Sequence, residues 1–391
     1  MGEPAKLWTP AFILLNLQFL LVTSVTALFF PFQAYLSGLG FSHDATGFLI
    51  GADALASLLV QSVAMLLIHP GSARLWLAGG SVLFAVALFL EGHSTTFAPL
   101  LATRLLQGAG FSCAVSALIC MIAEAIPSGM SGRAFGWTSL IRLVPYAAAP
   151  PLFDAFGIPP AAFGQVLQAS ALLALAPAAL ALAPLQAAAP VRPEAAAGPP
   201  GLSGAAASLR SRPVVLLLLA CLMLYSGYSA TFFYVRELAA SLGIHNSGMF
   251  FTLAMSMMIV VRLSGGALFD RLDKVRVSAG ALVLVAAAYA ALPFAARSEA
   301  FFALALVLGL GWGAVMPLQA AAMFDISPEA ARGLNQNLLM TVMQASFFTG
   351  PALAGLLLSK AGFTGLFLGA ALASTLAALA TGLIRPPCRP Q

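Results

Sequence analysis

Apolar and polar positions follow one another along the chain in long blocks. Runs of about 20 apolar residues, enough to cross a ~30 Å hydrocarbon core as a helix, are separated by short polar segments. The runs lack the period-2 alternation of barrel strands, so helices must satisfy their backbone groups. The pattern predicts an all-α membrane protein with twelve transmembrane helices, near residues 10–36, 46–68, 75–91, 97–124, 133–153, 163–185, 213–235, 248–268, 275–296, 299–325, 333–358 and 363–384.

A segment of different composition separates the predicted helices into two sets of six. It is rich in Ala, Pro, Gly and Ser and carries three arginines, which suits a flexible linker rather than a packed core. The sequence therefore predicts an N-terminal six-helix bundle at 1–186, a cytoplasmic linker at 187–212 and a C-terminal six-helix bundle at 213–391.

The two halves repeat each other in the fourth and tenth predicted helices. A glycine, an acid and a proline recur there with the same spacing: Gly110, Glu124 and Pro127 in the first half, and Gly311, Asp325 and Pro328 in the second. An arginine, Arg133 or Arg332, opens the helix that follows. We infer that a six-helix unit was duplicated, which predicts two pseudo-symmetric bundles with a substrate site between them at mid-membrane.

Composition and charge agree with a membrane protein and exclude a water-soluble domain. The chain is 61% hydrophobic and 8% charged, against roughly 45–50% and 25% in soluble domains. With the N-terminus inside, twelve cations fall on the cytoplasmic side and only Arg236, Arg297 and Lys360 fall outside. We expect a multi-pass protein of a bacterial inner membrane with both termini cytoplasmic, and the alanine-rich composition suggests a GC-rich bacterial genome.

The end of the eighth predicted helix carries Gly266, Asp270, Arg271 and Lys274. This stretch resembles the signature loop of the major facilitator superfamily (MFS), in which a glycine is followed after three residues by Asp-Arg and then by basic residues. The resemblance implies the MFS fold and alternating access, with a cytoplasmic gate formed by these four residues together with Glu124, Asp325, Arg133 and Arg332. The first half keeps only the final cation of this loop, Arg74.

Arg104, Gln107 and Gly108 in the fourth predicted helix resemble the Arg-x-x-Gln-Gly motif of proton-coupled members of the superfamily. A membrane arginine needs a partner, and Asp53 lies at a similar depth in the second helix. The resemblance assigns Arg104 to proton coupling, and protonation of Asp53 could break an Asp53–Arg104 pair. The alternative is a fixed salt bridge that holds the first half together.

The substrate cavity is expected to combine aromatic walls with few polar groups. Arg142, in the fifth helix, could bind an anionic substrate group, bridge to Asp53 or serve the structure alone. The other candidates are Gln33 and Phe30 from the first helix, Tyr225, Tyr228 and Phe232 from the seventh, and Asn337 and Gln344 from the eleventh. Helix packing and interfacial anchoring are the alternative roles for these side chains.

These observations predict a secondary transporter that exports a small amphipathic or metabolite-like molecule by proton antiport. Import by proton symport of an organic anion, or uncoupled uniport, remains open, as does a membrane enzyme or receptor. The sequence contains no nucleophile paired with a base, no metal-ligand cluster and no nucleotide-binding loop after a strand. We therefore expect no enzyme activity, cofactor, metal or nucleic-acid partner, and a monomer with substrate, protons and lipid as its partners.

Overall fold

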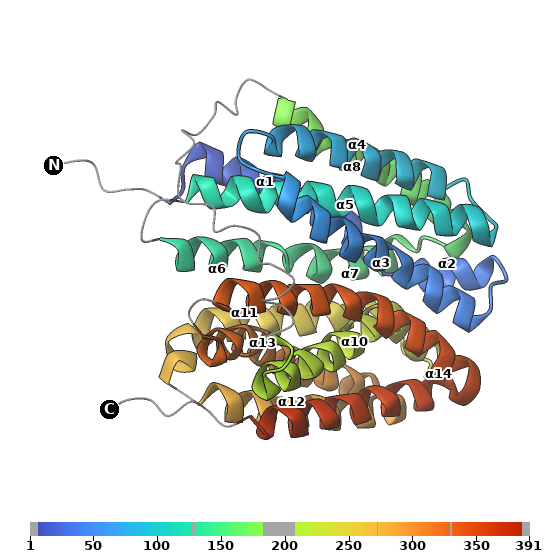
Figure 1. Ribbon diagram of the computed structural model, residues 1–391. Coiled ribbons are helices and arrows are strands. Elements are labelled where there is room, and N and C mark those ends of the chain that lie inside the picture. Colours follow the sequence, from blue (N-terminus) through green and yellow to red (C-terminus); the bar gives the residue numbers. More distant parts are fainter. Residues whose placement is uncertain (1–6, 127–129, 183–207, 272, 329–330, 385–391) are drawn as a thin grey trace. The chain divides into compact units, whose positions relative to one another are not determined.

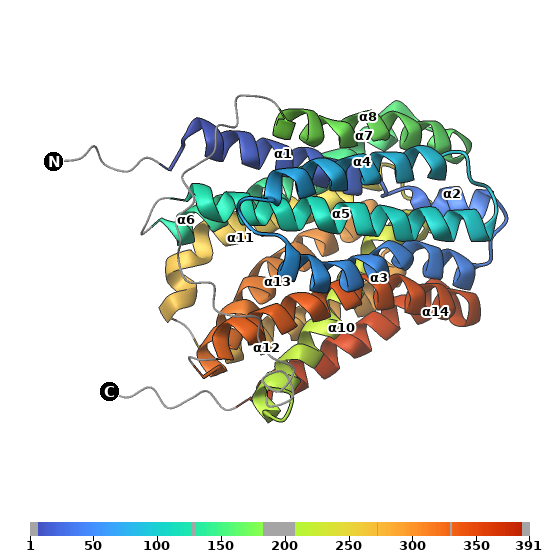
Figure 2. The same ribbon diagram turned by 45° about the horizontal axis from the view of Figure 1, so that its top comes forward.

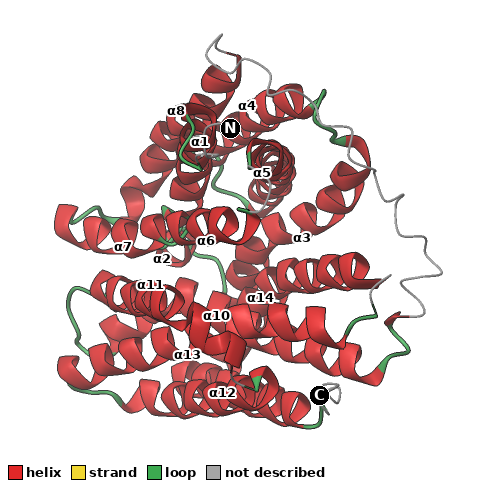
Figure 3. Cartoon of the chain, turned by 90° about the vertical axis from the view of Figure 1, so that its left-hand side faces the viewer, coloured by secondary structure: helices red, strands yellow, loops and turns green. Residues whose placement is uncertain are grey.

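The computed structural model describes residues 7–126, 130–182, 208–271, 273–328 and 331–384. Within these ranges every regular element is a helix, as the red ribbons of Figure 3 show. The predicted all-α class is therefore confirmed. Most of the predicted linker at 187–212 lies outside the described residues.

The first half of the described chain forms eight α-helices and one short 3-10 helix (Figure 1). They are α1 (Pro10–Ala27), α2 (Phe32–Gly38), α3 (His43–Leu67), α4 (Ala73–Glu91), α5 (Phe97–Ala125), α6 (Ser131–Ile141), α7 (Val144–Phe156), η1 (Pro160–Ala162) and α8 (Phe163–Leu182). Two predicted helices are interrupted, one at 28–31, where Pro31 precedes α2, and one at 142–143. Each interruption divides what the hydropathy pattern indicated as one span.

The second half contains longer, less interrupted helices. They are α10 (Arg212–Ser241), α11 (Gly248–Arg271), α12 (Lys274–Ala291), η2 (Leu292–Phe294), α13 (Ser298–Ile326) and α14 (Arg332–Gly382). Helix α14 covers the eleventh and twelfth predicted spans, and Gly362, at φ 65° and ψ −168°, marks the bend between them. Only glycine adopts that conformation readily.

Eight helices of the described chain are long and apolar enough to cross a membrane, and Gly248–Ser264 is a shorter apolar helix. Leu334–Gly382 enters this set as one helix of 49 residues, although it is bent at Gly362. The twelve-span count stays a prediction.

Contacts divide the chain into two compact units. As far as their residues are described, the first unit comprises Met1–Leu39, Ala52–Ala149 and Gly157–Ala196, and the second comprises Gly40–Gly51, Pro150–Phe156 and Ala197–Gln391. In the first unit α4 packs on α5 and α8, and α1 packs on α5 and α8. In the second unit α14 packs on α10 and α12, and α13 packs on α11 and α12. The predicted boundaries at 186 and 213 stay a prediction.

Two short segments of the first half belong to the second unit because of tight local packing. A Cβ atom at Gly47 would collide with the carbonyl oxygen of Pro351, so the start of α3 lies directly against α14. The Asp154 carboxylate accepts a hydrogen bond of 2.6 Å from the backbone N–H of Gly248, at the start of α11. That position suits a carboxylate, because the first N–H groups of a helix have no partner within it.

The internal repeat is visible in the helix bounds. Helices α5 and α13 begin and end with the same difference in residue number (298 − 97 = 326 − 125), and the starts of α4 and α12 differ by the same amount (274 − 73). We call this constant difference the repeat offset. Figure 2 shows α4 and α5 running side by side, and α12 packs on α13 in the same way. The duplication inferred from the sequence thus extends to the helices of both units.

Candidate functional site

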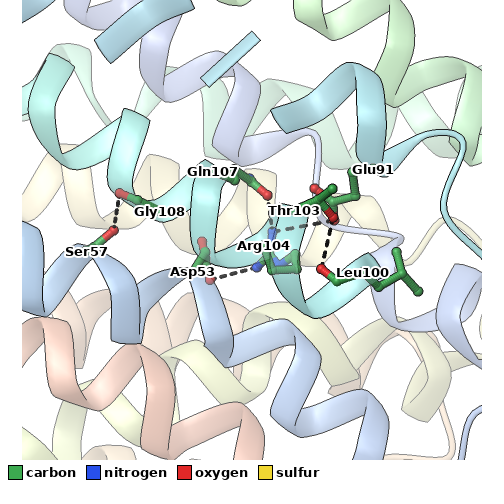
Figure 4. Close-up of polar contacts among 8 residues, drawn as sticks. All are labelled: Asp53, Ser57, Glu91, Leu100, Thr103, Arg104, Gln107 and Gly108. Atoms are coloured by element: carbon green, nitrogen blue, oxygen red, sulfur yellow. Dashed lines mark hydrogen bonds and ion pairs between the residues drawn. The ribbon is translucent and has the colours of Figure 1, made fainter. Parts of the chain in front are cut away.

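An ion pair between Asp53 of α3 and Arg104 of α5 lies inside the first unit (Figure 4). Arg104 Nη2 lies 2.7 Å from Asp53 Oδ1, and Arg104 Nη1 donates a hydrogen bond of 2.6 Å to Gln107 Oε1. The Arg104 side chain is 1% exposed, whereas the Asp53 side chain keeps 31%. The structure therefore brings together the two residues that the sequence analysis expected to interact.

Small residues allow α3 and α5 to approach closely enough for this pair. A Cβ atom at Gly108 would collide with the Asp53 carbonyl oxygen. The Ser57 hydroxyl donates to the Gly108 carbonyl at 2.9 Å, and the Ser112 hydroxyl donates to the Ser57 carbonyl at 3.2 Å. Helix pairs in membranes depend on such small residues and interhelical hydrogen bonds. The position of Asp53 beside Arg104 thus follows from the glycine and serines around it.

Two aromatic rings cover the Arg104 guanidinium. Its central carbon lies 4.9 Å from the centroid of the Phe29 ring and 5.0 Å from that of Phe32. Phe29 lies in the interruption between α1 and α2, where the chain turns at 28–31, and Phe32 is the first residue of α2. A cation over an aromatic face is stabilised by the ring quadrupole, most strongly where water is excluded. The broken first span therefore contributes directly to the site.

A second acid, Glu91 at the end of α4, shares the same guanidinium. Glu91 Oε1 lies 3.9 Å from Arg104 Nη1, and its side chain is 0% exposed. Neither carboxylate oxygen accepts a hydrogen bond from the residues that the structure describes. The sequence analysis missed Glu91 because it stands at the end of an apolar run. One signal was available: an acid in the last turn of a helix opposes the helix dipole, so it needs a special reason to be there.

The other candidates of the first unit lie on α2 and in the two helix interruptions, at 28–31 and 142–143. Arg142 is exposed, and its guanidinium lies 5.2 Å from the centroid of the Phe19 ring. No ion pair joins it to Asp53 within the described residues, so the structure shows no such bridge. Gln33 is 1% exposed and donates to the Ser37 hydroxyl at 3.2 Å, and Phe30 is fully buried.

The aromatic candidates of the second unit divide into two groups. The Tyr228 ring packs edge-on against Trp312 at 4.9 Å and lies 6.2 Å from Phe347, which Tyr225 also approaches. Phe232 packs instead on Phe251, at 5.2 Å. The two polar candidates of α14, Asn337 and Gln344, are both partly exposed. The structure thus assembles Tyr225 and Tyr228 with two rings that the sequence analysis did not single out.

The predicted gate residues are described only in part. Arg133, Gly266, Asp270 and Arg271 lie outside the residues whose side chains are described. Lys274 Nζ lies 2.6 Å from Asp325 Oδ2, which joins the start of α12 to the end of α13.

Two further gate candidates have described side chains. The Arg332 guanidinium carbon lies 4.3 Å from the centroid of the Phe324 ring. Glu124 is partly buried at the end of α5. The gate roles of the whole set stay a prediction.

Comparison with known proteins agrees with this architecture. A family model described as Major Facilitator Superfamily matches residues 13–296 and 236–391. Two solved structures of the nucleoside transporter NupG are similar in fold: a point mutant, with a TM-score of 0.79 and 14% identity, and another structure with 0.76 and 13%. Each alignment covers 95% of this chain and 98% of the other. A search of curated proteins returns no match.

Proposed function

Because this chain belongs to the Major Facilitator Superfamily, we propose that it is a proton-coupled exporter of a small organic molecule, with Asp53 and Arg104 as the coupling pair. The family and the fold support secondary transport of a small molecule by a multi-pass membrane protein, and they favour a transporter over an enzyme. The family and the fold do not give the direction of transport or its coupling to protons. Our proposal of export and proton coupling rests on the ion pair.

The observation that carries the proposal is a comparison of each helix pair with its repeat. Gly108 packs against the backbone of Asp53, and Gly309, one repeat offset later, packs in the same way against the backbone of Ala254. Ala305 stands at the position of Arg104. The same helix packing therefore forms with two alanines in place of the ion pair. This argues against a pair kept only to hold the helices together.

The pair has the properties that a proton switch requires. A carboxylate beside a guanidinium favours the charged form, whereas burial favours the neutral form, so the balance is sensitive to small changes around the site. When Asp53 gains a proton, it loses its attraction for Arg104, and the guanidinium can move. Because Asp53 is the partly exposed partner, a proton can enter on its side.

The charge balance of the site favours a neutral or cationic substrate. Arg104 is paired and enclosed, so its positive charge is not available to an anionic molecule. The partly exposed rings of Tyr225 and Phe347, which pack with the buried rings of Tyr228 and Trp312, provide flat apolar faces, which suit an organic ring system. Nucleosides belong among the candidates because the similar structures are nucleoside transporters. Import of an anion bound at Arg142 is the alternative.

Proton movement during transport tests the proposal directly. Purified protein in liposomes that contain a pH-sensitive dye is exposed to nucleosides and to neutral, cationic and anionic amphipathic compounds. A transported compound should move protons in the opposite direction, and Asp53→Asn should abolish that movement. The matched control is Asp44→Asn, which changes an exposed aspartate in the first turn of the same helix. Substrate flux without proton movement in the native protein would indicate a uniporter, and flux in the same direction as protons would indicate a symporter.

We also propose a monomer in a bacterial inner membrane, with both termini in the cytoplasm. The support for the orientation is the bias of twelve cations to three across the predicted loops. Reporter domains fused to the C-terminus and to the predicted outer loop near Arg297 should report opposite compartments. Equal compartments for the two fusions would contradict the predicted orientation.

A further inference from the structure

A second carboxylate, that of Glu91, lies beside Arg104 and is not part of the proposed Asp53–Arg104 coupling pair. Glu91 is fully buried, lies 3.9 Å from Arg104 Nη1 and accepts no hydrogen bond from any described residue. Figure 4 shows Arg104 with Asp53 on one side and Glu91 on the other. One guanidinium therefore lies between two acids.

The charges of these three groups do not balance if all are ionised. Two carboxylates and one guanidinium leave a net negative charge in a site where Glu91 is 0% and Arg104 is 1% exposed. An uncompensated buried charge is costly, and such groups usually become neutral instead. Arg104 lies closer to Asp53, at 2.7 Å, and thus compensates Asp53 first. A proton on Glu91 makes the site neutral.

We propose that Glu91 is a second proton-carrying group, protonated while Asp53 holds Arg104, and ionised as the counter-ion of Arg104 once Asp53 takes up a proton. In this exchange one O–H bond forms on Asp53, one O–H bond breaks on Glu91, and the proton of Glu91 leaves to water. The site holds one proton and no net charge before and after. The inference rests on the proposed proton coupling and adds a second acid to it.

Arg104 is the principal charged neighbour of Glu91. Among the described residues, the titratable groups that interact with it are Arg104 on α5, Asp53 on α3 and Tyr35 on α2. His93 follows α4 at an exposed position, where its ring lies within hydrogen-bond distance of the Gln168 amide of α8. The charge of Glu91 is therefore tied to Asp53 through Arg104.

The geometry lets Arg104 serve either acid. Its Nη2 faces Asp53 and its Nη1 faces Glu91, so a small movement of the guanidinium exchanges one partner for the other. The two acids differ in access, because Asp53 is 31% exposed and Glu91 is 0% exposed. This asymmetry gives the two acids separate roles, proton uptake at Asp53 and proton storage at Glu91.

Infrared spectroscopy of the purified protein tests the proposal without any substrate. A protonated carboxylic acid has its own carbonyl stretching band. We expect one such band in the native protein to be lost in Glu91→Gln, and the same band to be lost in Asp53→Asn, where Glu91 becomes the only acid left for Arg104. The matched control is Glu237→Gln, another buried carboxylate without a hydrogen-bond partner among the described residues, and it should retain the band.

Two results would overturn the proposal. If Glu91→Gln removes no band, Glu91 is ionised in the native protein. If the Glu91 band persists in Asp53→Asn, the two acids are independent. Asp44→Asn makes the same substitution on an exposed part of α3, so it should leave the band unchanged.

Transport measurements then separate this inference from the proposed function. In liposomes, Glu91→Gln should lose substrate-driven proton movement and retain exchange of labelled for unlabelled substrate, which needs no net proton step. A native protein that transports substrate without protons contradicts the proposed function. A native protein that couples, beside a Glu91→Gln variant that couples equally well, contradicts only the role of Glu91.

Discussion

Helices α3, α4 and α5 of the first unit and α11, α12 and α13 of the second unit share one packing scheme but differ in chemistry. A Cβ atom at Gly110 would come within 2.9 Å of the Gly80 carbonyl oxygen, and one at Gly311 would come within 3.4 Å of the Ala281 carbonyl oxygen. The repeat offset again relates the two pairs. The scheme is therefore set by glycines at equivalent positions, and it is present whether or not the helices carry charge.

The three charged residues of the ion-pair site have no charged counterparts at the equivalent positions of the second unit. By the repeat offset, Asp53, Arg104 and Glu91 correspond to Ala254, Ala305 and Leu292. All three of these apolar residues are fully buried. The comparison shows that a membrane helix packing of this kind does not need the charges. Their presence in the first unit, at a cost in desolvation, supports the role in proton coupling that we propose.

The first helix of each half differs in a second way. Helix α10 is continuous from Arg212 to Ser241, whereas its counterpart in the first unit is broken between α1 and α2. The break presents Phe29 and Phe32 to Arg104. At the position of Phe29 the second unit has Ala230. The unit that carries the buried cation is thus also the unit whose backbone departs from a regular helix.

The largest expected effect comes from leaving Arg104 without an acid. The double variant Asp53→Asn/Glu91→Gln keeps the buried guanidinium and removes both carboxylates. Removing the partner of a buried charge costs about 3–5 kcal/mol, so we expect a large fall in folded yield and in the thermal midpoint in detergent. The single variants should be affected less, because each leaves one acid.

The control for the double variant replaces Asp53, Arg104 and Glu91 with the apolar residues that stand at the equivalent positions of the second unit. Asp53→Ala/Arg104→Ala/Glu91→Leu places the residues of the uncharged helices in the first unit, and it should recover most of the stability while losing proton coupling. If this triple variant is as unstable as the double variant, the ion-pair site holds the helices together after all, and the comparison between the units is misleading.

A second prediction concerns the shared packing. Gly108→Ala and Gly309→Ala each push a Cβ atom into the backbone of the neighbouring helix, and overpacking of this kind costs about 1–3 kcal/mol. The two variants should lower the thermal midpoint to a similar extent. Gly79→Ala and Gly280→Ala are matched controls, related by the same repeat offset, where a Cβ atom has open space. A loss of stability at only one of the two packed glycines would mean that the units do not share the scheme.

Much of this comparison could be predicted from the sequence, because it depends on spacing. Long apolar runs predicted the all-helical class, and the recurrence of Gly110 as Gly311 predicted the duplication. Asp53 and Arg104 were expected to meet because helix rise places them at similar depths. These inferences need only distances along helices, which the chain determines locally.

Two parts of the site could not be predicted from the sequence because they depend on tertiary contacts. Glu91 stands at a helix end, where an acid usually faces solvent, and only the packing of α4 against α5 encloses it beside Arg104. The break between α1 and α2 was hidden within an apolar run, although Pro31 lies in it. Hydropathy averages over such a run, so it detects the span and not the turn that brings Phe29 to the site.

A third prediction sharpens the role of the aromatic rings. Phe29→Leu keeps most of the buried volume but removes the ring face beside Arg104. We expect a loss of about 1 kcal/mol, since a cation over a ring contributes about 0.5–2 kcal/mol. The control in the second unit is Phe250→Leu, a buried ring packed on Phe251 and Phe301. Thermal unfolding should show the larger loss at Phe29, and an equal loss at both sites would mean that the ring serves only to fill space.

The smallest expected effect comes from an ion pair of the second unit, and it shows why distance alone does not rank such pairs. Lys274 lies 2.6 Å from Asp325, slightly closer than Arg104 is to Asp53, but Asp325 is 44% exposed and Lys274 is 18% exposed. Solvent screens exposed pairs, whose contribution is about 0.2–1 kcal/mol. Lys274→Gln and Asp325→Asn should therefore each change the thermal midpoint only slightly, and the double variant should add little. If the Lys274 and Asp325 variants were as unstable as Asp53→Asn/Glu91→Gln, burial would not be what distinguishes the ion-pair site of the first unit. The argument that the buried charges of Asp53, Arg104 and Glu91 are costly would then fail.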